Sequence, residues 1–462
     1  MKKVVIVTHW LDGDVVPFVR IGTELKNRGY EVILITHCKF EHIAREAGLD
    51  FDSWDTAEEY KMLVEDMQLH KLDDVYTKNY SFSNSPFRQK YENNEKRLKE
   101  YYTILKHCSP KDTVIVCKNR SSIAAYIVAE KMNIPLATVM MNPSEISNML
   151  MYETLEAEND VDRLNKLRES VDLPPIKSWL QWESSAKMTL ALWPQWYDST
   201  CCEEWPSKID SVGFPLENGK ETYNIKIPER FENWLSKNPR PIVISGGTTK
   251  YIKDDFYRSS ISACALSGQP TVVLTRYKEL LPASLPDNVV WYDYLPLNKI
   301  LDKVSLLIHH GGIGTLANAL NAGTPQLILP CYVDRPYNAS IVKKFGVGDY
   351  LYANDWAAPT ILNKIRSIQD VHVKEKCSQF IYRMKNNHGI TSAADKIEKL
   401  FDKERYVYSI NTHFRFNEPI PKAKNTDQSK SSAVSAAHEI LSKMSDDQKQ
   451  KLMNRIRSQR IQ

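Results

Sequence analysis

The segment of this sequence best suited to chemistry is a glycine-rich run, His309-His310-Gly311-Gly312-Ile313-Gly314-Thr315-Leu316. It follows an apolar stretch and opens a helical pattern. Glycines let a backbone approach a ligand closely, and a helix N-terminus presents free N–H groups and a positive dipole end. This arrangement suits a diphosphate, to which Thr315 could add a hydroxyl donor and His310 an imidazole N–H. An ordinary glycine-rich turn with a satisfied histidine is the alternative interpretation.

The elements that must position this run form a repeating pattern. Short apolar runs at Val4–Thr8, Glu31–Thr36 and Val114–Cys117 are typical of buried strands, and Val16–Arg28 has helical spacing that ends at Gly29. Strand–helix–strand units of this length favour a parallel sheet covered by helices on both faces.

The pattern restarts in the second half of the chain. Pro241–Ser245, Thr271–Leu274, Val304–Ile308 and Gln326–Leu329 predict strands, with a helix at Leu316–Ala322. We therefore expect an α/β protein with two doubly wound domains that face each other across a cleft. Ligands bind such sheets at the carboxyl ends of the strands.

Composition shifts suggest the domain boundaries. We predict a first domain at 1–212, a linker at 213–240 that opens with the polar, turn-rich Gly213–Lys220, a second domain at 241–402, and a flexible linker with a helical extension at 403–462. Residues 50–110 are expected to form loops and helices inserted in the first domain.

Composition also excludes several classes of protein. The 61 Lys and Arg exceed the 57 Asp and Glu by four and form no long run, which gives no footprint for general nucleic-acid binding. No apolar stretch approaches the roughly 20 residues needed to cross a bilayer, and the apolar run near the amino terminus is too short for a signal peptide. Eight cysteines without a CxxC pair predict neither a disulfide framework nor a metal site. We expect a cytoplasmic protein.

The glycine-rich run has informative neighbours: Asp293–Asn298 before it, and Ala322–Pro325, Leu329–Ala339 and Gly346–Gly348 after it. In this order the segments resemble the nucleotide-sugar signature of the family-1 glycosyltransferases, which have the GT-B fold of two facing Rossmann-like domains. The amino terminus is similar to the same family. Its Gly13–Phe18 segment matches the Gly-Asp-Val-x-Pro form of the sterol and glycopeptide-antibiotic glycosyltransferases, where many other members have Gly-His.

The resemblance implies which residues hold the donor. The matched positions, for the diphosphate, the base and the sugar, are Gly247, Thr248, Tyr294, Leu295, His310, Gly312, Gly314, Thr315 and Asp334. The family commonly has Gln where this chain has Arg335. A guanidinium only donates hydrogen bonds and always carries charge, so Arg335 either favours an anionic sugar or pairs with Asp334. We favour the pairing.

The resemblance also implies a general base for the acceptor hydroxyl. Asp14 is the candidate, and it works best if its surroundings raise its pKa or if another group pairs with it. His9, at the end of the first strand, could share or replace this role. Alternatively, Asp14 caps the helix that follows, and His9 is structural.

Together these features predict an inverting, metal-independent hexosyltransferase of natural-product biosynthesis. It would move a sugar from a UDP- or dTDP-sugar to a hydroxyl of a lipophilic or aromatic small molecule, without a cofactor. An apolar acceptor wall could come from Met140, Met141, Met149, Met151, Trp193, Trp196 and Tyr197, although such residues are more often core.

Other functions stay open at this point. The chain could be a catalytically idle partner that only binds sugar nucleotides, or a sugar-nucleotide epimerase. A dinucleotide oxidoreductase is weakened because no GxGxxG follows the first strand. The helix at Ser445–Arg457 could dock on a partner protein.

Overall fold

Two compact units make up the protein. The computed structural model describes residues 2–69, 86–155, 157–199, 208–216, 226–248, 250, 252–253, 255–331 and 333–401. One unit contains residues 1–10, 14–213 and the segment from 389 onward, and the other contains residues 11–13 and 214–388. The predicted extension at 403–462, with its docking helix, lies outside the described residues, as do residues 217–225 of the predicted linker.

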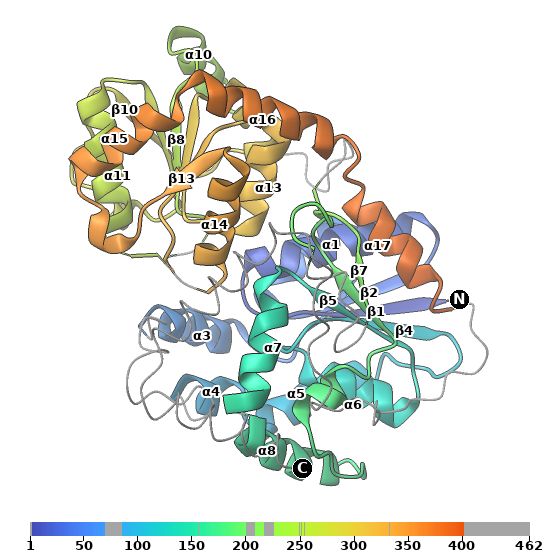
Figure 1. The fold of residues 1–462 in the computed structure, drawn as a ribbon. Helices are drawn as coiled ribbons and strands as arrows, with labels where there is room; N and C mark the ends of the chain where they lie inside the picture. Colours follow the sequence, from blue (N-terminus) through green and yellow to red (C-terminus); the bar gives the residue numbers. More distant parts are fainter. Residues whose placement is uncertain are drawn as a thin grey trace, which may run out of the picture. The chain divides into compact units, whose positions relative to one another are not determined.

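The first unit is built on a parallel sheet of seven strands in the order β3-β2-β1-β4-β5-β6-β7 (Figure 1). The strands are β1 Lys3–Val7, β2 Glu31–Ile35, β3 Asp50–Asp52, β4 Thr113–Lys118, β5 Leu136–Met140, β6 Met188–Ala191 and β7 Ile209–Ser211. The order reverses between β1 and β4. Successive strands are therefore added in opposite directions on the two sides of this point, and doubly wound sheets bind ligands at such a point.

Helices flank this sheet. They are α1 Asp12–Asn27, α2 Glu41–Glu46, α3 Ala57–Leu69, α4 Pro86–Tyr91, α5 Asn94–Leu105, α6 Ile123–Met132, α7 Ser144–Leu155, α8 Ala157–Glu169, α9 Trp179–Glu183 and α17 Gly389–Glu398. Alternate residues of β1 face opposite cores, because Val5 and Val7 pack in one cluster with residues of α5 and α6. On α1, a Cβ at Gly22 would lie 3.0 Å from Ile6 Cδ1, so glycine permits α1 to lie close to the other face.

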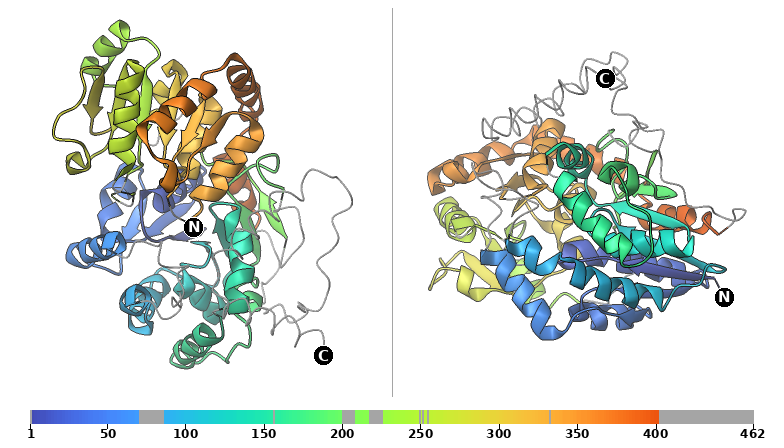
Figure 2. Two further views of the ribbon diagram at one scale, coloured as in Figure 1. Left: turned by 60° about the vertical axis from the view of Figure 1, so that its left-hand side comes forward. Right: turned by 90° about the horizontal axis from the view of Figure 1, so that it is seen from below.

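The second unit has a parallel sheet of six strands in the order β10-β9-β8-β11-β12-β13. The strands are β8 Ile242–Ser245, β9 Thr271–Leu274, β10 Val289–Tyr292, β11 Leu306–His309, β12 Gln326–Ile328 and β13 Gly348–Tyr350. Its helices are α10 Glu229–Lys237, α11 Asp255–Ser267, α12 Leu297–Ile300, α13 Ile313–Ala322, α14 Arg335–Phe345, α15 Ala358–Ile368 and α16 Val371–Met384 (Figure 2).

Both faces of the second sheet are buried. Ile242 and Ile244 of β8 pack in one apolar cluster, and Val243 between them packs in another. Two buried faces are the signature of a sheet covered by helices on both sides. The predicted α/β architecture, with two parallel sheets, is confirmed.

The last described helix belongs to the first unit, whereas the sequence assigned residues up to 402 to the second domain. Arg28, just after α1, pairs with Asp395 and Glu398 of α17 at 2.7 Å each. The ring of Phe401 stacks on Tyr30 with centroids 5.2 Å apart. These contacts join segments more than 360 positions apart, which no local sequence pattern reports.

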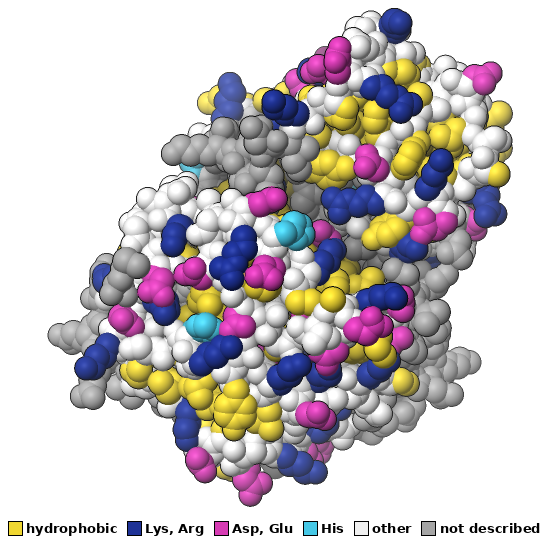
Figure 3. Space-filling view, turned by 180° about the vertical axis from the view of Figure 1, so that it is seen from behind, with side chains coloured by type: hydrophobic (Ala, Val, Ile, Leu, Met, Phe, Trp, Pro, Cys, Tyr) yellow, Lys and Arg dark blue, Asp and Glu magenta, His cyan; other side chains and the backbone are white. Residues whose placement is uncertain are grey.

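Charges of both signs are interspersed on the face drawn in Figure 3, where no large area of one sign stands out. Among the helices that the structure describes, none is long and apolar enough to span a membrane.

Candidate active site

The glycine-rich run joins β11 to α13 in the second unit. Gly312 is the N-cap of α13, with extended backbone and no side-chain cap. The first N–H groups of a helix have no intrahelical partner. Gly311 has φ +95°, a left-handed conformation that glycine adopts without strain. The turn therefore presents the uncapped N–H groups of Ile313, Gly314 and Thr315 to whatever binds in front of the helix.

His309 supports this turn from beneath. It is fully buried, its Nε2–H donates to Gln326 Oε1 at 3.0 Å, and its Nδ1 accepts the N–H of Gly311 at 3.2 Å. Burial lowers the pKa of His309 to about 3, so the imidazole is neutral at physiological pH. Its role is to fix the backbone of the loop.

His310 packs between two glycines of different loops. A Cβ added to Gly247 would lie 2.9 Å from His310 Cε1, and one added to Gly312 would lie 2.5 Å from His310 Nε2. Burial, together with the nearby charge of Arg335, lowers the pKa of His310 well below its ordinary value. The structure thus brings together Gly247, His310 and Gly312, three of the predicted donor residues.

Asp334 is linked to the same turn. It precedes α14 as its N-cap, and Asn338 Nδ2 donates to both Asp334 Oδ2 (2.7 Å) and the carbonyl of Gly311 (2.9 Å). A Cβ on Gly311 would lie 3.1 Å from Arg335 Cβ, so Arg335 also adjoins the turn. The favoured pairing of Arg335 with Asp334 stays a prediction.

The remaining predicted donor residues follow neighbouring strands. Tyr294 and Leu295 come after β10; Leu295 is buried, and the Arg276 guanidinium lies 5.5 Å from the centroid of the partly exposed Tyr294 ring. Thr248 follows β8 and is exposed; its carbonyl accepts from the Tyr277 hydroxyl at 3.5 Å. All of them lie at the carboxyl edge of the second sheet, as the glycine-rich turn does.

Asp14, the candidate base, lies in the first turn of α1 and forms an ion pair. Lys118 Nζ, at the end of β4, is 2.8 Å from Asp14 Oδ1, and the two side chains are 13% (Lys118) and 28% (Asp14) exposed. The Thr8 hydroxyl donates to the Asp14 carbonyl at 2.9 Å. The ion pair holds the Asp14 carboxylate in place at the start of α1.

His9 is buried, and protein groups face both of its ring nitrogens. The Ser122 hydroxyl lies 3.2 Å from Nδ1, and Glu100 Oε1 lies 3.1 Å from Nε2. In this geometry the imidazole has no nitrogen directed at a substrate, which makes His9 a poorer candidate for the base than Asp14.

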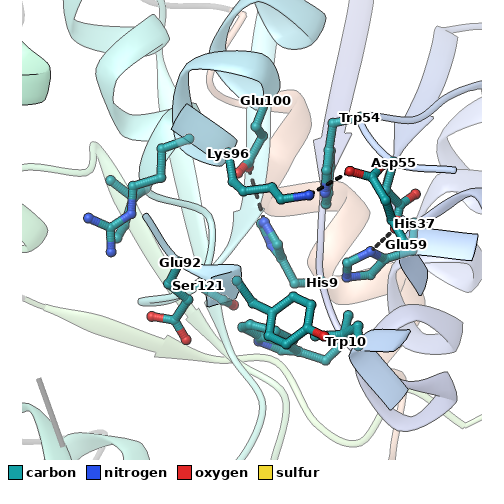
Figure 4. Close-up of a pocket in the computed structure, with 14 residues that line it drawn as sticks. His9, Trp10, His37, Trp54, Asp55, Glu59, Glu92, Lys96, Glu100 and Ser121 are labelled. Atoms are coloured by element: carbon teal, nitrogen blue, oxygen red, sulfur yellow. Dashed lines mark hydrogen bonds and ion pairs between the residues drawn. The ribbon is translucent and has the colours of Figure 1, made fainter. Parts of the chain in front are cut away.

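A pocket in the first unit contains a pair that the sequence analysis did not anticipate (Figure 4). His37 follows β2 and Asp55 follows β3, and His37 Nδ1 lies 2.6 Å from Asp55 Oδ2. The sequence signal for this pair is that both residues are polar and follow a strand. His37 follows the predicted strand Glu31–Thr36, and Asp55 follows the observed strand β3. Neither position is unusual by itself.

The predicted apolar acceptor wall is mostly core. The buried members of the set are Met140, Met141, Met149, Trp193 and Tyr197. None of them lines the pocket of Figure 4. Met151 lies outside the side chains that the structure describes. Across the described ranges, no three His, Cys, Asp or Glu side chains converge in a group that could hold a metal ion.

Comparison with known proteins places this geometry in context. Residues 266–400 match the model of the erythromycin biosynthesis protein CIII-like C-terminal domain. An aclacinomycin-T 2-deoxy-L-fucose transferase of Streptomyces galilaeus is 28% identical over 53% of this chain and 60% of its own length. A sterol 3-beta-glucosyltransferase of Candida albicans is 22% identical over 92% of this chain and 30% of its own length. The chain thus spans less than two thirds of both relatives.

Solved structures agree on the fold. The glycosyltransferase of kitacinnamycin has a TM-score of 0.65 at 17% identity, covering 86% of this chain and 99% of its own. The glycosyltransferase VinC, solved with dTDP, has a TM-score of 0.61 at 17% identity, covering 87% of this chain and all of its own. The resemblance to the family-1 glycosyltransferases of the sterol and antibiotic type is confirmed: this chain has the GT-B fold, and its residues 266–400 are similar to the EryCIII-like C-terminal domain.

Proposed function

We propose that this protein is an inverting glycosyltransferase that moves a sugar from a UDP- or dTDP-sugar to a hydroxyl of a lipophilic or natural-product small molecule. The observation that carries the proposal is the β11–α13 turn, where uncapped N–H groups, two close-packed glycines and a neutral His310 converge. Such a site suits a diphosphate, because it offers donors and a positive dipole end in fixed positions.

In the proposed reaction, Asp14 accepts the proton of the acceptor hydroxyl while the acceptor oxygen attacks the anomeric carbon of the sugar. The bond from that carbon to the diphosphate oxygen breaks, and the electron pair leaves with the nucleoside diphosphate. Attack from the side opposite the leaving group inverts the anomeric configuration. The N–H groups of Ile313, Gly314 and Thr315 stabilise the charge that develops on the diphosphate, so the transfer needs no metal ion.

The remaining donor contacts follow from the same proposal. Leu295 would meet the base through its backbone, Tyr294 would lie near the ring, and Asp334 would bind sugar hydroxyls. Asn338 supports this role for Asp334, because it fixes the carboxylate relative to the Gly311 carbonyl. The dTDP in the VinC structure and the antibiotic and sterol glycosyltransferases among the relatives support the choice of nucleotide and acceptor class.

Gly314 offers a sharp test of the donor site. No atom of the described residues lies within 4 Å of a Cβ added there, so Gly314→Leu should fold normally while its side chain occupies the space before the helix. We expect wild type to bind UDP or dTDP in calorimetric titrations with or without EDTA, and Gly314→Leu to bind at least tenfold more weakly. Asn321→Leu, exposed at the far end of α13, is the matched control and should bind as wild type does. Equal binding by wild type and Gly314→Leu would reject the assignment.

The base is tested separately. Asp14→Asn should leave nucleotide binding unchanged and lower kcat at least a hundredfold, measured with UDP- or dTDP-glucose and a panel of hydroxylated acceptors. Product from the wild type should have the inverted anomeric configuration by NMR. Nucleotide binding without any turnover, in wild type and variant alike, would instead support the idle-partner function.

A further inference from the structure

The pocket of the first unit lies near the point between β1 and β4 where the strand order of the sheet reverses. His9 and Trp10 follow β1, His37 follows β2, and Asp55 follows β3 (Figure 4). All of these residues lie at the carboxyl edge of the sheet, the edge at which doubly wound folds bind ligands. All of its lining residues belong to the first unit, whereas the β11–α13 turn belongs to the second.

His37 has one satisfied and one unsatisfied ring nitrogen. Its side chain faces Asp55, whose Oδ2 lies 2.6 Å from His37 Nδ1 and whose Oδ1 accepts the N–H of Cys38 at 2.8 Å. Burial is the main effect on the pKa of His37 and lowers it, so the ring is neutral. The only proton of a neutral ring then lies on Nδ1, where the carboxylate accepts it. Nε2 is left as an acceptor.

Nε2 of His37 is buried and has no hydrogen-bond partner in the part of the chain that the structure describes, while the residue as a whole is only 5% exposed. Buried polar atoms are nearly always satisfied, and an unsatisfied one destabilises the protein. His9, in the same pocket, contrasts with it, because Ser122 and Glu100 face both of its nitrogens. Among the described residues, none donates a hydrogen bond to Nε2 of His37.

Aromatic rings surround this acceptor. The centroids of Tyr60, Trp54 and Trp10 lie 5.0, 5.3 and 6.2 Å from that of His37. Trp10 has φ +79°, a left-handed conformation that is unfavourable for a bulky residue, and its carbonyl accepts from the Tyr60 hydroxyl at 3.0 Å. Strained backbone of this kind clusters at ligand sites.

We propose that His37 positions the acceptor: its Nε2 accepts a hydrogen bond from a ring hydroxyl of a flat aromatic compound bound beside Trp10 and Trp54. This inference rests on the proposed function for the ligand's role as acceptor, and not for its binding. The pocket then selects flat rings that carry a hydroxyl and rejects their ethers, since an ether leaves Nε2 unsatisfied.

The test is a calorimetric titration of the full-length chain with 2-naphthol and 2-methoxynaphthalene, which differ in the hydroxyl proton. Wild type should bind 2-naphthol about tenfold more tightly. His37→Phe keeps a ring of similar size without the acceptor, and it should bind both probes equally. Equal binding of the two probes by wild type, or binding of neither, would overturn the proposal.

Asp55→Asn provides the sharper variant. Its amide can satisfy both neighbours in one orientation, with Oδ1 accepting from Cys38 N–H and Nδ2 donating to His37 Nδ1. The ring proton must then move to Nε2, which becomes a donor. The preference for 2-naphthol should vanish or reverse, and ¹⁵N NMR of the histidine rings should show the changed tautomer. A changed tautomer with an unchanged preference would reject the role of Nε2.

A matched control lies on the same sheet. His107 Nε2 is 2.6 Å from Asp52 Oδ2, and Asp52 Oδ1 accepts the N–H of Ser53 at 2.9 Å, so Asp52 contacts a histidine ring and a backbone N–H outside the pocket as Asp55 does inside it. Asp52 also pairs with Lys106 Nζ at 2.7 Å. Asp52→Asn should leave the probe preference unchanged. The proposed function has its own readouts in nucleotide binding and turnover. If wild type shows no preference for 2-naphthol but still binds the nucleotide, the result therefore contradicts this inference and not the proposed function.

Discussion

Glu183 is a carboxyl group that the fold holds in an unfavourable place. It is 3% exposed at the end of α9, and the Trp179 indole N–H donates to its Oε2 at 3.1 Å. Its Oε1 has no hydrogen-bond partner within the described part of the chain. Burial raises the pKa of Glu183 to about 7, and the charge of Arg120 offsets that effect only in part.

The raised pKa predicts how stability depends on pH. In the unfolded chain Glu183 ionises near its ordinary pKa of about 4.3, so between pH 4.3 and 7 the folded state binds more protons. The contribution of Glu183 is therefore fully present below about pH 4.3 and is lost as pH rises through 7. Glu183→Gln should remove this loss and gain about 2–3 kcal/mol of unfolding free energy at pH 8 relative to pH 4.5, measured by urea titration. A gain that is the same at both pH values would contradict the assignment.

Residues in one contiguous run were the predictable part of the site. His310, Gly312 and Thr315 lie within seven positions, and a strand followed by glycines and a helix is a local pattern that predicts a turn suited to a diphosphate. His37, Asp55 and Trp10 come from three loops, and only the sheet order brings them together. The pairing of Asp14 with Lys118 was equally hidden, because the two residues are far apart in sequence although β1 and β4 are neighbours.

At the scale of elements, both apolar packing and ion pairs attach α17 to the rest of the first unit. Ala393, Ala394 and Ile397 form its buried face. Arg28 pairs with Asp395 and Glu398, and Lys396 Nζ lies 3.0 Å from Asp210. Exposed ion pairs contribute about 0–1 kcal/mol each, whereas loss of a buried Ile side chain costs about 2–5 kcal/mol. Apolar packing must therefore dominate.

This comparison gives a measurable ranking. Ile397→Ala should destabilise the attachment of α17 by about 3 kcal/mol, and Arg28→Gln by about 1 kcal/mol. Amide hydrogen exchange of residues 389–398 reads both effects locally. Salt at 0.5 M should weaken the wild-type attachment to nearly the level of Arg28→Gln and leave the Ile397→Ala increment unchanged. A larger effect for Arg28→Gln would reverse the ranking.

The strands that the sequence predicts agree with the structure to within two residues, because buried parallel strands are continuous apolar runs. The short strands β3, β6, β7, β10 and β13 were not predicted, and β3 begins the segment 50–110, for which the sequence indicated only loops and helices. Thr271–Leu274 matches the predicted bounds, and the strand predicted at Val304–Ile308 was placed two residues early at its start. The affiliation of α17 was not predictable. Its sequence records an apolar face but not the identity of the surface that covers it.

At the scale of the whole molecule, each of the two units has apolar clusters of its own. One apolar cluster contains Val5 and Ile115 of the first sheet, and others contain Ile244 and Val243 of the second. Separate cores allow separate unfolding transitions. A ligand that binds one unit should then stabilise that unit alone.

Differential scanning calorimetry checks this expectation. UDP or dTDP at a hundred times its Kd should stabilise the second unit by about 2.7 kcal/mol and raise its Tm by about 5–10 °C. The transition of the first unit should stay in place. If the nucleotide moves both transitions together, the two units unfold as one.

Because α17 belongs to the first unit, this unit is completed only at the end of synthesis. About 175 residues separate Gly213 from Gly389, and they include the whole second sheet. A ribosome that adds about 5–20 residues per second needs about 10–35 s for that stretch. During this interval all strands of the first sheet have been synthesised, but the surface on which Ile397 packs is still exposed. The nascent first unit therefore stays open until the second unit has been made, and its last helix closes it.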